Sequence, residues 1–383
     1  MSPAAPPTPS PGRDAVSDQP ITYAGAGVDV EAGDRAVTLM RDWVAKTRRP
    51  EVVGGIGGFA GLFDASALRA YRRPLLATST DGVGTKVQIA QRLDVHDTIG
   101  FDLVGMVVDD IVVCGAEPLF MTDYIACGAV VPERIAAVVK GIAQACVQAG
   151  CALLGGETAE HPGLLGPSEY DVAGAATGVV EADDLLGPDR VRDGDVLVAM
   201  ASSGLHSNGY SLVRRVIEVA GWGLERHVDV LGRTLGEELL EPTRVYAADV
   251  LDLARAPDVD VHAVSHVTGG GLAANLARVL PRHLEAVVER GTWTPAPVFS
   301  LVRDLGRVPA PDLERTLNLG VGMIAVVAAA DADAAVRRLE ARGVPAWVLG
   351  QVRSQQPTGA DDVTQGAKGV DGGAVRMLGA HPA

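Results

Sequence analysis

Residues 75–86, which read Leu-Leu-Ala-Thr-Ser-Thr-Asp-Gly-Val-Gly-Thr-Lys, decide how the fold is interpreted. The first half, Leu75 to Thr80, is predicted to be a strand, and the second half, Asp81 to Lys86, a turn that leaves it. Its two glycines allow backbone N–H groups to face an anion, and its lysine adds a positive charge. The spacing is not that of a Walker A loop. Taken alone, the turn is compatible with a phosphate site or with an ordinary strand end.

Strands and helices alternate on both sides of this stretch, which predicts an α/β protein with mixed sheets. The polar segment 181–190 is the candidate boundary between a domain at 21–182 and a second domain at 183–354. Residues 1–20 and 355–383 contain few patterned apolar residues, so both are predicted to be disordered tails. The predicted helices are 31–46, 99–113, 132–148, 212–219 and a helix ending near 342, and the predicted strands are 75–80, 119–126, 151–155, 170–180, 195–200, 262–267, 321–329 and 346–352.

Two carboxylates lie inside an apolar helix, at Asp109 and Asp110. Helical spacing places Asp110 on a face with Leu103 and Met106, where an unpaired charge is costly. The alternatives are a buried ion pair, a helix end that reaches solvent, or a Mg²⁺ site to which Asp81 also contributes.

Four further loops contain glycine together with polar residues, at 54–58, 155–160, 202–211 and 268–271. The acids in Gly155-Gly-Glu-Thr-Ala-Glu160 either project together at a cleft edge or form a solvated turn. His206 could transfer a proton near neutral pH, or it could be a plain loop residue. Together with the spare carboxylates, these loops favour an enzyme that handles a phosphorylated substrate and ATP–Mg²⁺.

The bulk composition narrows the class of partner. The chain has 383 residues with 33 basic and 48 acidic side chains, a net charge of −15, which disfavours nucleic acid and anionic membranes as partners. No apolar run reaches the ~18–20 residues of a membrane span. Four cysteines without a Cys-x-x-Cys pair are typical of a reducing compartment. The sequence therefore predicts a cytoplasmic enzyme that acts on a small molecule.

Read in order, these segments resemble phosphoribosylformylglycinamidine cyclo-ligases (AIR synthetases) of the PurM-like superfamily over residues 21–352. The motifs that carry the resemblance include KTRRPE (46–51), GGIGGF (54–59), TDGVGTK (80–86), Asp-x4-Gly-Ala-x-Pro (110–118), GGETAE (155–160), SSGLHSNGYS (202–211) and TGGG (268–271). Asp109 departs from the family pattern, in which Asn is common. Thiamine-monophosphate kinase, selenophosphate synthetase and formylglycinamidine ribonucleotide synthetase share the fold and are the nearest rival functions.

The resemblance implies a two-domain fold that works as a homodimer, in which the N-terminal domains pair their sheets across the interface. It implies the ATP-dependent cyclisation of formylglycinamidine ribonucleotide to 5-aminoimidazole ribonucleotide, with release of ADP and phosphate in purine biosynthesis. His206 is our candidate for proton transfer, and Lys86 and Asp110 are further catalytic candidates. The implied Mg²⁺ ligands are Asp81, Asp110 and Glu157. The implied ATP-binding residues are Gly54, Gly55, Gly57, Gly58, Asp81, Gly82, Thr85, Lys86 and Asp123. The implied substrate-binding residues are Glu157, Thr158, Ser207, Asn208, Gly209, Thr268, Gly269, Gly270 and Gly271.

Overall fold

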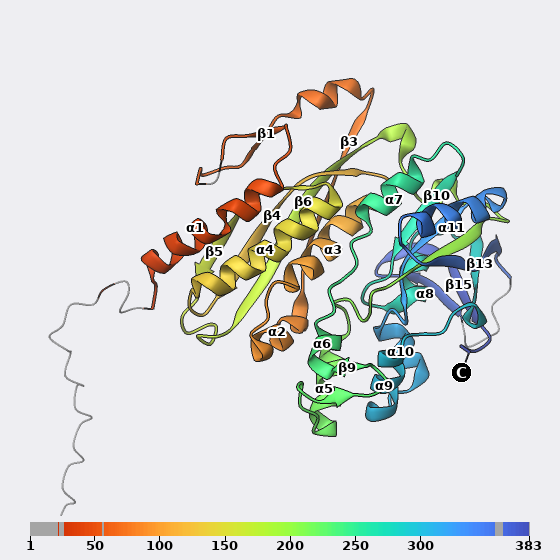
Figure 1. The fold of residues 1–383 in the computed structure, drawn as a ribbon. Helices are drawn as coiled ribbons and strands as arrows, with labels where there is room; N and C mark the ends of the chain where they lie inside the picture. Colours follow the sequence, from red (N-terminus) through yellow and green to blue (C-terminus); the bar gives the residue numbers. More distant parts are fainter. Residues whose placement is uncertain (1–21, 23–26, 56, 357–362, 383) are drawn as a thin grey trace, which may run out of the picture.

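A computed structural model describes residues 22, 27–55, 57–356 and 363–382, so the predicted tail at 1–20 lies outside the described residues. The described chain forms two sheets, each with its own helices, that lie side by side in Figure 1. This mixed α/β architecture confirms the predicted fold class.

The first sheet has four strands in the order β3-β6-β4-β5, of which only the pair β4–β5 is parallel. Its strands are β3 (Pro74–Gly82), β6 (Tyr170–Glu181), β4 (Glu117–Cys127) and β5 (Ala152–Glu160). Asp81, Gly174, Asp123 and Gly156 lie opposite one another in one row across it. This row fixes how far apart the candidate site residues of the domain lie.

Helices cover one face of this sheet and leave the other open (Figure 1). They are α1 (Val30–Lys46), α2 (Val87–Leu93), α3 (Ile99–Val112) and α4 (Pro132–Ala149). Aliphatic side chains of α3 and α4 are buried against the strands. On the opposite face Leu76 is 63% exposed and Tyr124 43% exposed, and no described helix packs over them.

The second sheet has seven strands in the order β10-β12-β7-β13-β11-β15-β14. They are β7 (Val196–Ala201), β10 (Val261–His266), β11 (Leu284–Glu289), β12 (Val321–Val327), β13 (Ala346–Ser354), β14 (Val363–Ala367) and β15 (Val370–Leu378). The helices of this half are α5 (Tyr210–Ala220), α6 (Leu235–Leu239), α7 (Ala247–Ala254), α8 (Gly271–Ala277), α9 (Pro297–Gly306), α10 (Ala310–Thr316) and α11 (Ala332–Ala341). Two short hairpins complete the fold, β1 (Val52–Val53) with β2 (Leu62–Phe63) and β8 (His227–Val228) with β9 (Arg233–Thr234).

The predicted disordered tail at 355–383 is wrong for residues 363–378, which form β14 and β15 of the second sheet. Strand β15 runs parallel to β11 and buries Ala374 and Val375 completely. Its glycines hid this strand from pattern analysis, yet one of them is required by packing. A Cβ on Gly372 would lie 2.0 Å from the carbonyl oxygen of Ala277, so only glycine allows the strand to approach α8 this closely.

Most other predicted elements are present, with ends that differ by a few residues. Segment 155–160 is an exception, because it continues β5 as an extended strand and does not form a loop at the strand end. The helices α2, α6, α7, α9 and α10 and the strand β11 were not predicted. Among the described residues, no helix is long and apolar enough to cross a membrane.

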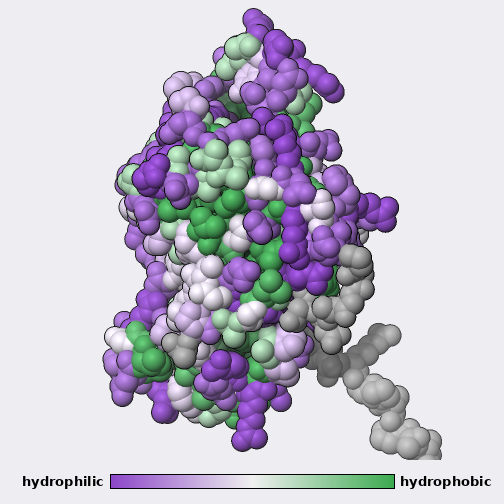
Figure 2. Space-filling view, turned by 90° about the vertical axis from the view of Figure 1, so that its right-hand side faces the viewer, coloured by the Kyte–Doolittle hydropathy of each residue, from purple (hydrophilic) through white to green (hydrophobic). Residues whose placement is uncertain are grey.

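Figure 2 shows the end of the molecule that is formed by the second sheet and its helices. Hydrophilic residues cover most of this face, and hydrophobic residues gather toward its middle. The two halves of the chain meet on the other side, where α3 and α4 contact α7.

Candidate active site

Two exposed carboxylates face the second domain from the ends of β3 and α3. Asp81 ends β3, and its Oδ1 accepts the backbone N–H of Gly82 at 2.7 Å. Asp110 lies in the last turn of α3, and its Oδ1 is 2.8 Å from Nδ1 of His266. The side chain of Asp110 is 42% exposed, whereas that of His266 is 2% exposed. Each carboxylate therefore keeps an oxygen that can bind a ligand.

The prediction that Asp110 lies on the apolar face of its helix is wrong, because Asp109 is the buried member of the pair. Both oxygens of Asp109 lie 3.0 Å from the backbone nitrogen of Tyr246, which donates to them from the second domain. Complete burial raises the pKa of Asp109 to about 7. Helix α3 is apolar almost all round, so hydrophobic periodicity could not assign which acid points inward.

We expect Asp109→Asn to stabilise the protein increasingly as pH rises. The aspartate releases its proton near pH 4 when unfolded and near 7 when folded, so its charge lowers the free energy of unfolding between these values, by up to about 4 kcal/mol. Asparagine carries no charge, and its oxygen can accept the Tyr246 N–H. The free energy of unfolding should be measured with urea at pH 5 and at pH 8. We expect the difference between variant and wild type to be about 2–3 kcal/mol larger at pH 8. A pH-independent difference, equal to that of the exposed control Asp229→Asn, would contradict this result.

Loops of the second domain lie opposite the two exposed carboxylates. The amide of Asn208 donates to Sδ of Met106 at 3.2 Å, and a Cβ on Gly269 would lie 3.2 Å from Oδ1 of Asn208. The hydroxyl of Thr85 lies 3.3 Å from that of Ser211. The structure thus brings Asp81, Gly82, Thr85, Asp110, Asn208 and the turn Thr268–Gly271 together where the two domains meet, and this junction is called the cleft below.

Lys86 does not face this cleft, which corrects its predicted role as a phosphate ligand. Its side chain is fully buried, and Nζ donates to Oδ1 of Asp102 at 2.7 Å. The other donors reach the carbonyl oxygens of His206 at 2.9 Å and Glu241 at 2.7 Å. All three N–H groups are satisfied internally. Burial lowers the pKa of Lys86 and raises that of Asp102, while the ion pair opposes both shifts.

His206, the candidate for proton transfer, is buried and does not reach the surface of the cleft. It is 1% exposed and adopts the left-handed region with φ 61°. Its Nε2 lies 3.2 Å from the backbone nitrogen of Ser203, and its Nδ1 has no hydrogen-bond partner among the described residues. Burial lowers the pKa of His206 well below its usual range. A neutral, buried ring favours a structural role, and the neighbouring Ser207 is also buried.

His266 is the histidine that contacts a candidate acid, and the sequence analysis did not select it. The available signal was its position, two residues before the turn that begins at Thr268. Its hydrogen bond to Asp110 orients that carboxylate, as residues next to a metal ligand commonly do.

A second group of predicted residues lies at the far edge of the first sheet. Oδ1 of Asp123 sits over Gly156, and burial raises the pKa of Asp123 to about 7. Glu157 and Thr158 are on β5, beside a pocket of ≈ 540 Å³ under α1 that Asp123 also lines. Three strand spacings of about 4.8 Å separate β5 from β3, so Glu157 cannot share a cation with Asp81 of the same chain. Among the described residues, no three His, Cys, Asp or Glu side chains form a metal cluster.

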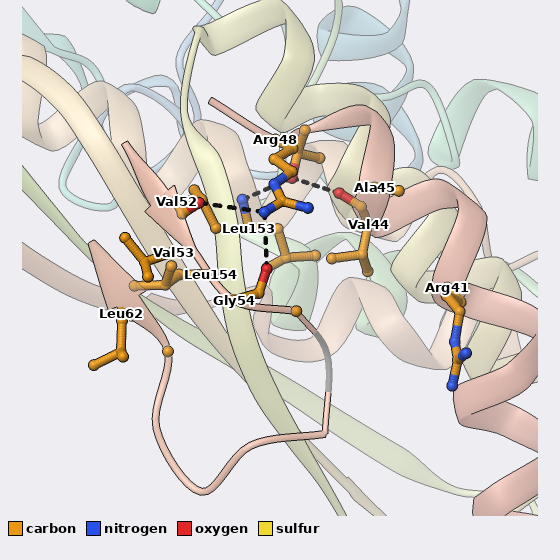
Figure 3. A pocket seen from close by; sticks show the side chains of 13 residues that line it. Arg41, Val44, Ala45, Arg48, Val52, Val53, Gly54, Leu62, Leu153 and Leu154 are labelled. Carbon is orange, nitrogen blue, oxygen red and sulfur yellow. Dashed lines mark hydrogen bonds between the residues drawn. The ribbon is translucent and has the colours of Figure 1, made fainter. Parts of the chain in front are cut away.

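The glycine-rich loop lies at this same far edge. Gly54 and Gly55 line a pocket of ≈ 330 Å³, while Gly57 and Gly58 are exposed beyond it. Figure 3 shows Arg48 held at this pocket by hydrogen bonds to the carbonyl oxygens of Val52 and Gly54, at 3.5 and 2.9 Å. The walls are largely aliphatic, formed by Val44, Val53, Leu62, Leu153 and Leu154. The pocket can take an apolar group next to the glycine-rich loop.

Comparison with known proteins identifies relatives over most of the chain. Residues 63–180 match the family "AIR synthase related protein, N-terminal domain", and residues 192–362 match its C-terminal domain. The phosphoribosylformylglycinamidine cyclo-ligase of Geobacillus kaustophilus (strain HTA426) is 51% identical over 331 residues, 86% of this chain and 95% of that protein. The enzyme of that name from Anaeromyxobacter sp. (strain Fw109-5) is 53% identical over 333 residues, 87% of this chain and 96% of that protein.

Solved structures share the fold at low sequence identity. Thiamine-monophosphate kinase from Stenotrophomonas maltophilia K279a superposes with a TM-score of 0.64 at 20% identity, over 91% of this chain and 97% of that chain. Hydrogenase maturation protein HypE in complex with ATP superposes with a TM-score of 0.58 at 21% identity, over 86% of this chain and 88% of that chain.

Proposed function

The chain belongs to the family of phosphoribosylformylglycinamidine cyclo-ligases, and on this premise we propose that the cleft between its two domains is the catalytic site. The enzyme cyclises formylglycinamidine ribonucleotide to 5-aminoimidazole ribonucleotide in purine biosynthesis, and it uses ATP. The observation that carries the placement is the pair of carboxylates, Asp81 and Asp110, that face the Thr268–Gly271 turn with oxygens to spare.

The donor set of the cleft fits Mg²⁺. This ion binds oxygen ligands, commonly one or two carboxylates together with phosphate oxygens and water. Asp81 and Asp110 would hold it, and His266 would keep the Asp110 carboxylate in place. When bound, the ion would neutralise charge on the transferring phosphoryl group. Glu157 of the same chain is too distant to complete the set.

In this reaction the main task of the protein is to position ATP and the substrate. The formyl oxygen attacks the γ-phosphorus of ATP, and ADP leaves with the electrons of the broken P–O bond. An amidine nitrogen of the same substrate then attacks the activated carbon, loses a proton, and phosphate departs with the former formyl oxygen. Ring closure is intramolecular, so holding the chain of the substrate folded supplies most of the acceleration. Asn208, Gly269 and Thr85 line the cleft where this conformation would be held.

The adenine of ATP fits the aliphatic pocket beside the glycine-rich loop better than it fits the polar cleft. This pocket lies at the β5 edge, while Asp81 lies on β3 at the opposite edge. Within one chain, therefore, the proposed adenine site is far from the Asp81 and Asp110 carboxylates. A homodimer that pairs the open faces of two first sheets would place the loop and Glu157 of one subunit near the cleft of the other. The unpaired cysteines support a cytoplasmic location for the enzyme.

We expect Leu76→Asp to disrupt this homodimer. Leu76 is 63% exposed on the open face of β3, so a charge there costs nothing in a monomer but would be buried on pairing. Light scattering coupled to gel filtration should give the mass of one chain for the variant and of two for the wild type. Val219→Asp, at a 69% exposed position on α5, serves as the matched control. A dimeric Leu76→Asp variant would rule out this interface.

An activity assay tests the proposed function directly. Purified protein, ATP and Mg²⁺ are mixed with formylglycinamidine ribonucleotide, and ADP and 5-aminoimidazole ribonucleotide are measured together. We expect the two products to form in a 1:1 ratio. Thiamine monophosphate is the competing substrate to include, because a kinase for it shares the fold. Turnover of ATP with thiamine monophosphate alone would overturn the proposal.

A further inference from the structure

The hairpin formed by β14 and β15 carries a lysine to the active-site cleft. The family match ends at residue 362, so this hairpin lies beyond it. Ala367 pairs with Val370 across a two-residue turn, Lys368-Gly369, in which both residues have positive φ, 50° and 78°. Such primed turns match the right-handed twist of the two strands of a hairpin. The chain has four lysines, and this is the one at a hairpin tip.

The tip of the hairpin rests on the Thr268–Gly271 turn. The Lys368 side chain passes this turn so closely that a Cβ on Gly270 would lie 3.6 Å from its Cε. Its Nζ donates to Oδ1 of Asn275 at 3.3 Å. Asn275 is buried and donates in turn to the carbonyl oxygens of Thr268 and Gly271, at 3.2 and 2.8 Å. The lysine is thereby tied to the turn that borders the cleft.

A second cation converges on the same amide oxygen. Nη1 of Arg278 donates to Oδ1 of Asn275 at 3.2 Å. Partial burial lowers the pKa of Lys368, and repulsion from Arg278 lowers it further. Neither cation forms a salt bridge with a carboxylate within the described part of the chain. One amide oxygen has two lone pairs, whereas lysine has three N–H donors and arginine five, so several donors remain for a ligand. Two exposed cations that meet with no carboxylate in salt-bridge distance among the described residues indicate an anion site.

The position of the pair relates it to catalysis. Asp110 and Asp81, the proposed Mg²⁺ ligands, lie close enough to favour the charged form of Lys368. Lys86, which the sequence predicts to bind phosphate, is instead held in a buried ion pair with Asp102. The cleft thus takes its lysine from the C-terminal hairpin.

We propose that Lys368 and Arg278 together bind a terminal phosphate group at the mouth of the Thr268–Gly271 turn. The inference rests on the proposed function for the identity of the ligand, which is either the 5′-phosphate of the nucleotide substrate or the γ-phosphate of ATP. Both are dianionic phosphates that accept charge-assisted hydrogen bonds.

The test measures binding of inorganic phosphate to the full chain by isothermal titration calorimetry. We expect Lys368→Gln and Arg278→Gln each to raise the dissociation constant at least about tenfold, because each removes a charged hydrogen bond. Lys368→Arg should bind nearly as the wild type does. The control is Arg282→Gln, which removes an exposed cation that pairs with Asp371 on the same hairpin and should change nothing. Unchanged phosphate affinity in Lys368→Gln, or no binding by the wild type, overturns the proposal.

Steady-state kinetics distinguish the two sources of phosphate. A rise in KM for formylglycinamidine ribonucleotide alone assigns the site to the substrate, and a rise in KM for ATP alone assigns it to the γ-phosphate. If Lys368→Gln leaves both values unchanged, the site does not serve the reaction and the proposal fails. A wild type that binds phosphate but forms no 5-aminoimidazole ribonucleotide would instead refute the proposed function and leave the anion site standing.

Discussion

Lys86→Met is expected to lower the free energy of unfolding by about 3–5 kcal/mol, because it leaves the fully buried Asp102 carboxylate without its cation. The Oδ2 atom of Asp102 already has no hydrogen-bond partner among the described residues. Its Oδ1 retains only the N–H and hydroxyl of Thr243, at 3.1 and 2.6 Å. Urea unfolding monitored by circular dichroism measures the loss.

A second variant separates this structural role from phosphate binding. Lys86→Met/Asp102→Leu removes both charges and should recover part of the stability, since apolar replacements of a buried ion pair are often tolerated. Its KM for ATP, measured at a temperature where it is folded, should stay close to that of the wild type. A stable single variant with a KM for ATP raised tenfold or more would show that Lys86 reaches the nucleotide after all.

Asp110→Asn is expected to lower kcat/KM by at least about 10³, while the melting temperature changes little. The amide keeps the shape of the side chain and can still hydrogen-bond to His266, but it lacks the charge that binds a divalent cation. Loss of several kcal/mol of transition-state stabilisation corresponds to a factor of this size. A coupled assay for ADP over a range of Mg²⁺ concentrations measures the effect.

The Mg²⁺ titration gives this experiment its specificity. Half-maximal activity of Asp110→Asn should require a higher Mg²⁺ concentration than that of the wild type, and Asp81→Asn should behave in the same way. Asp229→Asn, at a fully exposed position, is the matched control and should have wild-type kinetics. Near-normal rates in both cleft variants would refute the metal assignment.

Local patterns predicted the elements that depend on local signals. Helix α1 has an amphipathic face and an Asp29 cap that accepts the N–H of Ala32 at 3.0 Å, and helix α4 begins at a proline and is followed by Gly150 in the left-handed region. The turn after β3 is marked by its glycines. Such signals lie within a few residues of the element that they define.

The failures concern residues whose state depends on distant partners. Lys86 is buried because Asp102 and the carbonyl oxygen of Glu241, 155 residues away, surround it. Asp109 points inward because the backbone N–H of Tyr246, 137 residues away, donates to its carboxylate. No window of sequence around either residue contains that information. The ordered series of motifs found the family, but it could not tell the residues of the cleft from those behind it.

The buried carboxylates of α3 also bear on how modular this enzyme is. Asp102 accepts hydrogen bonds from Thr243, and Asp109 accepts one from Tyr246, so the first domain relies on main-chain donors of the second. If the chain were divided after Glu181, Asp109 would lose the N–H of Tyr246, and Asp102 would keep only the hydrogen bond from Lys86. The halves are therefore not interchangeable parts. A chimaera that joins this first domain to the second domain of a relative should fold only if the relative's backbone offers N–H groups at the same two places.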